Sequence, residues 1–290
     1  PKTSMQIYET SLRKCRQAEI PLFDGYEVIR LLSSNETGQR RVIGALALNR
    51  ERLHAPDHGL TVFAANNVVL ATGGPGEMFK TSVYPPGQVG SHGLALELGA
   101  RANNLSEFQF GLASTGFRWN LSGSYQQAVP CYFSTDADGT DVRYFLNDYY
   151  QDMGQVATNT FLKGYQWPFH AERLQAFGSS LIDIAVYEQR QQGRLVYMAL
   201  ASNPMPTGDF EPFALGLLSE EARTYLERSG ATAATPSERL KQLNPAAIEI
   251  YAEHRIDLQE PLEIAVCAQH CNGGISVNTC CSTSKAGSRS

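Results

Sequence analysis

The stretch NNVVLATGGPG, residues 66–76, decides the fold. Val68, Val69 and Leu70 form a short unbroken apolar run, a pattern typical of a strand that is buried on both faces. The run ends in Ala71–Gly76, where three glycines let the backbone turn tightly and approach a ligand closely. A buried strand that opens into a glycine turn is a common nucleotide position in an α/β sheet. Taken alone, these residues are equally compatible with a plain strand-to-loop turn.

Composition and charge exclude several classes of protein. The chain has 290 residues, of which 42% are hydrophobic and 18% charged, as in a globular protein of one or two domains. A net charge of -5 argues against nucleic-acid binding, because no basic surplus is present. No apolar run approaches the ~18 residues of a membrane span, and the first residues lack the apolar core of a secretory signal. We therefore expect a soluble, cytoplasmic protein.

Periodic patterns predict a helix and several strands around the glycine turn. Residues 3–18 have helical spacing, and residues 26–32 and 41–48 read as two strands of a hairpin whose turn is 35–38. Residues 60–64 are expected to form a third strand. After the glycine turn, the sequence predicts a helix over 90–100, a short strand over 107–110 and a turn over 111–116.

The second half of the chain is richer in helical patterns. Helices are predicted over 183–190, 219–229, 237–243 and 245–254, and strands over 194–198 and 262–266. We interpret residues 118–260 as a second, mostly helical domain that is inserted into a first domain made of 1–117 and 261–290. The fold class is then α/β (α+β).

Four motifs in order resemble one family. VVLATGGPG, GLALELGA (93–100) and EFQF (107–110) are followed, after the insertion, by QHCNGGI (269–275). Together they resemble the flavoprotein subunits of fumarate reductase and succinate dehydrogenase, a family that includes aspartate oxidase. The stretch FRWNLSGSYQQAVP (117–130) is further similar to a branch of FAD-binding oxidoreductases. The resemblance implies part of a Rossmann-like FAD-binding domain with an inserted capping domain, and FAD as the cofactor.

The resemblance also implies roles for individual residues. The residues expected to contact or approach FAD are Ala71, Thr72, Gly73, Gly74, Glu107, Gly273 and Gly274. His270 is expected to bind a carboxylate or oxygen of the substrate near the flavin. Thr115 stands where a threonine of the family contacts substrate. These two are the candidate catalytic residues.

Three departures from the family pattern bear on the substrate. Residues 90–93 read Gly-Ser-His-Gly where the family has T-G-D-G, so that His92 replaces an aspartate. Leu112 and Ala113 occupy the stretch in which the family carries a substrate histidine. Residues 179–182 read Ser-Ser-Leu-Ile where the family has an arginine that acts as the proton donor in fumarate reduction. We therefore expect a reaction other than ordinary fumarate reduction or succinate oxidation.

His92 heads a predicted helix, where it either caps the helix or donates a hydrogen bond to a phosphate. The phosphate-binding pattern G-x-G-x-x-G after a first strand does not occur in residues 1–60. On this basis we expect the chain to be the middle portion of a longer flavoprotein, which raises the question of whether it holds FAD by itself.

Cysteines near His270 could suggest a metal site. Cys267, Cys271, Cys280 and Cys281 lie close to it in sequence, but adjacent cysteines rarely ligate one tetrahedral zinc ion. We expect free thiols and no metal.

The function expected from the sequence is that of an FAD-dependent oxidoreductase. Hydride would pass between the flavin and a small anionic substrate, with an electron donor or acceptor as a further partner. The alternative is a catalytically silent fragment or binding module without flavin, because the phosphate-binding glycines and the family arginine are missing from the sequence.

Overall fold

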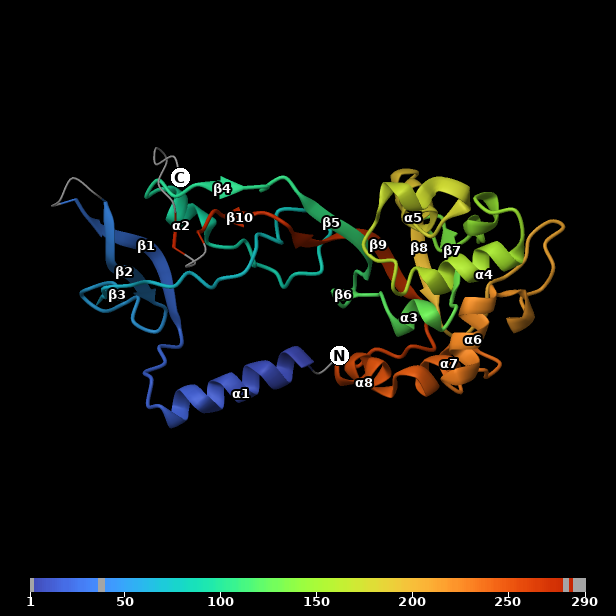
Figure 1. The fold of residues 1–290 in the computed structure, drawn as a ribbon, viewed down its shortest axis with the longest axis horizontal. Helices are drawn as coiled ribbons and strands as arrows, with labels where there is room; N and C mark the ends of the chain where they lie inside the picture. Colours follow the sequence, from blue (N-terminus) through green and yellow to red (C-terminus); the bar gives the residue numbers. More distant parts are fainter. Residues whose placement is uncertain (1–2, 36–39, 279–281, 284–290) are drawn as a thin grey trace. The chain divides into compact units, whose positions relative to one another are not determined.

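The computed structural model describes residues 3–35, 40–278 and 282–283. The chain divides into two compact units (Figure 1). The first consists of Pro1–Pro75, Val89–Glu107 and Asn272–Ser290, and the second of Gly76–Gln88 and Phe108–Cys271.

The first unit begins with a helix and a three-stranded antiparallel meander. Helix α1 spans Thr3–Gln17, and strands β1 (Tyr26–Ser34), β2 (Arg41–Asn49) and β3 (Leu60–Ala64) follow in the order β1-β2-β3. The rings of Phe23, Tyr26 and Phe63 meet edge to face beside this sheet. The predicted helix and strands are confirmed, while the hairpin turn falls largely on residues outside those described.

A second group of elements completes the first unit. Helix α2 spans His92–Leu96, and β4 (Ala102–Asn103) pairs antiparallel with β10 (Gly274–Ile275). Helix α2 is shorter than the predicted 90–100. It ends early because Gly99 takes a left-handed φ of 86° and the N–H of Ala100 bonds back to the carbonyl of Ala95.

The buried strand predicted at 68–70 is wrong. These residues have no regular secondary structure, and Val69 is 88% exposed. Strand β3 ends at Ala64 and pairs only with β2, in antiparallel fashion, so the described part of the chain provides no neighbouring strand at 68–70. A parallel strand needs such neighbours to satisfy its backbone groups.

The second unit is built on a five-stranded antiparallel sheet with the order β6-β5-β9-β8-β7. Its strands are β5 (Phe108–Ser114), β6 (Trp119–Asn120), β7 (Cys131–Thr135), β8 (Leu195–Ala199) and β9 (Leu262–Cys271). The turn predicted from residue 111 onward is wrong, because β5 continues and pairs Gly111 with Cys267 and Ser114 with Ile264.

Residues 76–88 belong to the second unit because they run beside β9. Ser82 forms a parallel bridge with Ala268, and the N–H of Val83 donates to the carbonyl of Ala268 at 3.3 Å. Strands β5 and β9 also lie in this unit, since β9 pairs with β8 at Leu262 and Glu263.

Helices cover the sheet of the second unit. They are α3 (Ser124–Gln127), α4 (Met153–Leu162), α5 (Leu181–Gln191), α6 (Glu220–Arg228), α7 (Pro236–Leu243) and α8 (Pro245–Glu253), with short 3-10 turns at Phe145–Asp148, Ala171–Phe177 and Leu215–Leu217. Helices α5 to α8 match predicted helices, whereas α4 was not predicted. Helix α7 starts one residue early because Thr235 and Glu238 form a capping box. None of the described helices is long and apolar enough to cross a membrane.

Candidate cofactor and substrate sites

The glycine turn after residue 70 packs against the residue pair that precedes α2. Gly73 and Gly90 both have left-handed φ angles, of 72° and 69°. A Cβ atom on Gly90 would lie 3.1 Å from the nitrogen of Pro75 and 3.2 Å from the carbonyl carbon of Gly74. Because glycine lacks that atom, the two backbone segments approach each other closely.

His92 lies beside both glycine turns of the first unit. Its Nδ1 is 3.0 Å from the position that a Cβ on Gly90 would take, and its Nε2 is 3.8 Å from the corresponding position on Gly274. Nδ1 is buried and has no hydrogen-bond partner among the described residues. No side chain caps α2, whose N-cap is Ser91, so the capping role considered for His92 is wrong. The imidazole therefore retains unused hydrogen-bonding capacity next to the two turns.

Glu107 and Gly273 meet through backbone contacts. The N–H of Asn272 donates to the carbonyl of Glu107 at 2.7 Å. A Cβ on Gly273 would lie only 2.0 Å from the carbonyl oxygen of Asn104, so any side chain there would displace the turn at 104–107. The short pairing of β4 with β10 holds Gly274 beside this turn.

The first unit contains all seven residues that were expected to contact or approach FAD. Gly74 and His92 both lie beside Gly90, and His92 also lies beside Gly274. Glu107 and Gly273 are connected through the backbone of Asn104 and Asn272. Ala71, Thr72 and Gly73 are exposed. Backbone turns without Cβ atoms and an unpaired imidazole nitrogen suit the hydroxyl and phosphate oxygens of a dinucleotide. These residues fit FAD.

The two candidate catalytic residues lie in the second unit. His270 is on β9 opposite Gln109, its side chain is exposed, and its imidazole makes no hydrogen bond with a described residue. Thr115 follows β5, and both its N–H and its hydroxyl donate to the carbonyl of Glu263, at 3.0 and 3.3 Å.

The structure does not bring His270 and Thr115 together. Thr115 is bound to Glu263, which lies seven positions before His270 on β9. At about 3.4 Å per residue the separation is ~24 Å, beyond the reach of one small molecule. One small substrate therefore cannot contact both residues.

Trp167 and Gln269 were missed as possible site residues. The Trp167 ring stands edge-on to the His270 ring, with 5.4 Å between their centroids. Gln269 is 2% exposed although it directly precedes the exposed His270. The proximity of Gln269 to His270 was visible in the sequence, but no local pattern indicates a contact between residues 167 and 270, which are 103 positions apart.

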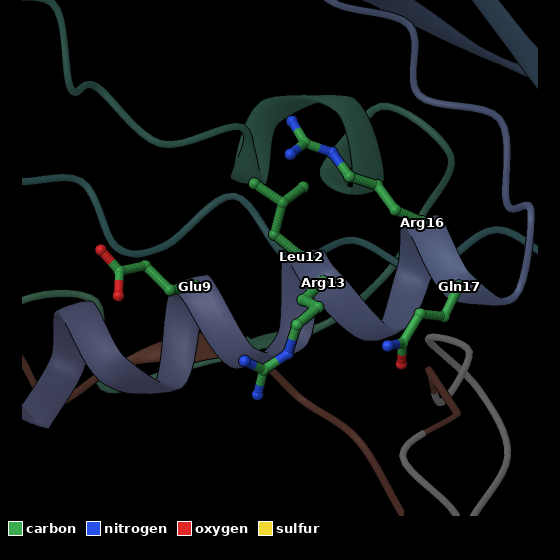
Figure 2. A pocket seen from close by; sticks show the side chains of 5 residues that line it. All are labelled: Glu9, Leu12, Arg13, Arg16 and Gln17. Carbon is green, nitrogen blue, oxygen red and sulfur yellow. The ribbon is translucent and has the colours of Figure 1, made fainter.

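A surface hollow of about 520 Å³ is not a ligand site. Its lining residues are Glu9, Leu12, Arg13, Arg16 and Gln17 (Figure 2). All five belong to α1, and no other described element supplies a wall. The hollow is one face of an exposed helix.

Three described cysteines are free thiols, as expected: Cys15, Cys131 and Cys267. Burial raises the pKa of Cys131 and of Cys267 to about 11 in each case, which makes both poor nucleophiles. Among the described residues, no three His, Cys, Asp or Glu side chains are placed to hold a metal ion. Cys280 and Cys281 lie outside the described residues.

Residues 1–153, more than half of the chain, match the model of a family described as FAD binding domain, and the chain belongs to this family. FAD, the predicted cofactor, is confirmed by this match.

Two solved structures share the fold. A quinol-fumarate reductase with menaquinol molecules superimposes with a TM-score of 0.55 at 19% identity, over 95% of this chain and 40% of that chain. The open conformation of a flavocytochrome c3 fumarate reductase gives a TM-score of 0.50 at 16% identity, over 96% of this chain and 47% of that chain. The resemblance to fumarate reductase flavoproteins and the mixed α and β fold class are thereby confirmed. The chain spans less than half the length of either structure, and no curated protein matches it.

Proposed function

We propose that the protein is an FAD-dependent oxidoreductase that acts on a small anionic substrate other than fumarate or succinate. The observation that supports this proposal is the position of His92 in the first unit, beside Gly90 and Gly274, with its Nδ1 unpaired among the described residues and Gly74 on the other side of Gly90. FAD, when bound, supplies the group that accepts or donates hydride.

The residues of the first unit bind and orient the cofactor. Gly73 and Gly74 let the backbone approach it, as do Gly273 and Gly274. His92 offers ring nitrogens as hydrogen-bond donors or acceptors, according to its tautomer. A histidine replaces the family aspartate without removing hydrogen-bonding capacity from this position.

In the second unit we assign substrate binding to His270. An exposed imidazole that makes no hydrogen bond with a described residue can donate a hydrogen bond to a substrate carboxylate. The hydroxyl of Thr115 already donates a hydrogen bond to the backbone carbonyl of Glu263. We therefore propose no joint role for Thr115 and His270.

The position of the family arginine supports a different substrate. The hydroxyl of Ser179 donates to Gln166 at 2.6 Å, and the hydroxyl of Ser180 accepts the N–H of His170 at 3.1 Å. Both serines are buried and committed to structural hydrogen bonds. Neither serine can supply the positive charge or the proton that the arginine of the family supplies. Fumarate reduction by the family route is therefore not expected.

The proposed binding of FAD is tested by titrating the protein with FAD and following the flavin fluorescence. His92→Ala is expected to weaken FAD binding about tenfold, the effect of losing one hydrogen bond to a charged group. His54→Ala, a substitution of an exposed histidine in the same unit, is the matched control and should leave the affinity unchanged. Equal affinities of the two variants would remove His92 from the site.

The substrate part is tested with His270→Ala in the FAD-loaded protein. We expect FAD affinity to be retained and turnover to be lost or KM to rise, because His270 acts on the substrate only. His170→Ala changes another exposed histidine of the second unit and should have no such effect. A protein that takes up no FAD would favour the alternative, a binding module without flavin.

A further inference from the structure

Two buried polar atoms lack partners beside His270. They are Nε1 of Trp167 and Oε1 of Gln269, and no described residue makes a hydrogen bond to either. An unpaired buried donor or acceptor costs about 1–3 kcal/mol of stability, and such groups call for an explanation.

Gly111 leaves the space that the side chains of Trp167 and Gln269 fill. A Cβ on Gly111 would lie 2.4 Å from Trp167 Nε1 and 3.0 Å from Gln269 Nε2. The indole and the amide therefore converge on the bare backbone of β5. Any side chain at position 111 would displace the indole of Trp167 or the amide of Gln269.

The backbone of β9 explains why Gln269 points inward and His270 outward. Gln109 pairs with His270 and Phe110 with Ala268, so Gln269 is the extra residue of a bulge. Its Nε2 donates to the carbonyl of Leu112 at 3.1 Å, which fixes the amide and leaves Oε1 unpaired. Bulges commonly redirect side chains next to active sites.

The segment that carries Trp167 is anchored on both sides. The N–H of Phe169 donates to the carbonyl of Phe110 at 2.8 Å, and Gln166 accepts the hydroxyl of Ser179 at 2.6 Å. These bonds place the Trp167 ring edge-on to the His270 ring, at an interplanar angle of 79°. The imidazole makes no hydrogen bond with a described residue, so the indole is the ring against which it rests.

We propose that Trp167 is a positioning residue that holds the His270 imidazole in one orientation for the substrate. This inference rests on the proposed role of His270, but the ring contact itself exists without FAD or substrate. The unpaired indole N–H is retained because the ring is needed beside His270. Function rather than stability then selects the tryptophan.

The test uses the full chain with ¹³C-labelled histidine and NMR relaxation of the imidazole C–H groups. In Trp167→Leu, the ring-current shift of the His270 signals should disappear, and the order parameter of the imidazole should fall below its value in the unsubstituted protein. Trp167→Phe keeps an aromatic ring, but a smaller one than the indole, so it should restore only part of the ring-current shift and of the order of the imidazole. Because Trp167→Phe removes the unpaired N–H donor, the unfolding midpoint of this variant should equal or exceed that of the unsubstituted protein.

A second pair of rings in the same unit is the control. His254 stacks on Phe117 with 4.0 Å between the ring centroids, and its signals should not respond to either Trp167 substitution. Trp119→Phe, which changes the other tryptophan of the chain, should leave the His270 signals unchanged.

Unchanged His270 signals and mobility in Trp167→Leu would overturn the proposal. So would a large loss of stability in Trp167→Phe that leaves the His270 imidazole rigid, because Trp167 would then be a structural residue. Neither result depends on FAD. Failure of the cofactor titration is therefore distinguishable from failure of this inference.

Discussion

The ammonium group of Lys163 donates a hydrogen bond to the carboxylate of Asp183 inside the second unit, where each side chain is only 2% exposed. Lys163 is the C-cap of α4, and Asp183 lies in the first turn of α5. Each charge therefore sits at the helix end whose dipole favours it. The second oxygen of Asp183, Oδ1, has no partner among the described residues.

Removing the lysine should strongly destabilise the second unit. Lys163→Met leaves the Asp183 carboxylate buried without its counter-charge, and we expect a loss of about 3–5 kcal/mol in the free energy of unfolding at pH 8. Lys163→Met with Asp183→Leu should recover most of this loss, because no charge remains to desolvate. Urea unfolding measures both. A single variant that is no less stable than the double variant would contradict the importance of the pair.

The loss in free energy of unfolding that Lys163→Met causes should also depend on pH. Burial raises the pKa of Asp183 to about 6, against the ordinary ~3.9 of an aspartate in an unfolded chain. Between these values the folded protein holds a proton that the unfolded chain has released. This contribution to stability is present below pH ~4 and lost as the pH rises through ~6. The loss caused by Lys163→Met should therefore be smaller at pH 5 than at pH 8, whereas the double variant should show no such dependence.

Arg239 is buried and has no carboxylate partner among the residues that the structure describes. It is 1% exposed, and its guanidinium donates to the carbonyls of Ala128 and Ala233, each at 2.9 Å, and to Oδ1 of Asn203 at 2.6 Å. Burial lowers its pKa to about 10, so the group stays charged at neutral pH. The planar guanidinium group thus connects α7 to two loops by hydrogen bonds.

Arg239→Lys should lower the free energy of unfolding by about 3 kcal/mol, because an ammonium group cannot reach acceptors in several directions. Thermal unfolding monitored by circular dichroism measures the change. Arg228→Lys, on the exposed end of α6, is the matched control and should change stability by less than ~0.5 kcal/mol. Similar values for the two variants would show that the hydrogen bonds of Arg239 contribute little.

Local patterns were sufficient for much of the fold. The meander β1–β3 and helices α5 to α8 follow from periodicity, although the start of α7 is set by Thr235, which the sequence did not single out. Long-range pairing was not accessible in the same way. Strand β5 runs through Gly111–Ser114 only because β9, about 150 positions later, pairs with it. Residues 68–70 carry a strand-like pattern but have no partner in the described part of the chain.

The proposed cofactor residues share one unit, whereas the two predicted substrate residues lie far apart along β9. Glycine turns are visible in the sequence, and residues 73–74 and 273–274 lie in the first unit together with His92. Thr115 and His270 were grouped by motif, but their distance along β9 separates them. The contact of Trp167 with His270 depends on tertiary structure alone, because each residue comes from a different segment.

Gly273 should be intolerant of a side chain. Gly273→Ala would place a methyl group 2.0 Å from the carbonyl oxygen of Asn104, and the turn at 104–107 would have to move. We expect FAD affinity to fall by at least tenfold in a fluorescence titration. Gly93→Ala is the control, since a Cβ there meets nothing within 4 Å. Loss of affinity in both variants alike would show that the effect is not local to the turn.

The most direct measurement is the visible absorption spectrum of the purified protein after incubation with FAD and removal of free cofactor by desalting. We predict that flavin bands stay with the protein in a one-to-one ratio and that His92→Ala retains less flavin under the same conditions. A colourless protein after desalting would contradict the assignment of this chain as an FAD-dependent oxidoreductase that holds its own cofactor.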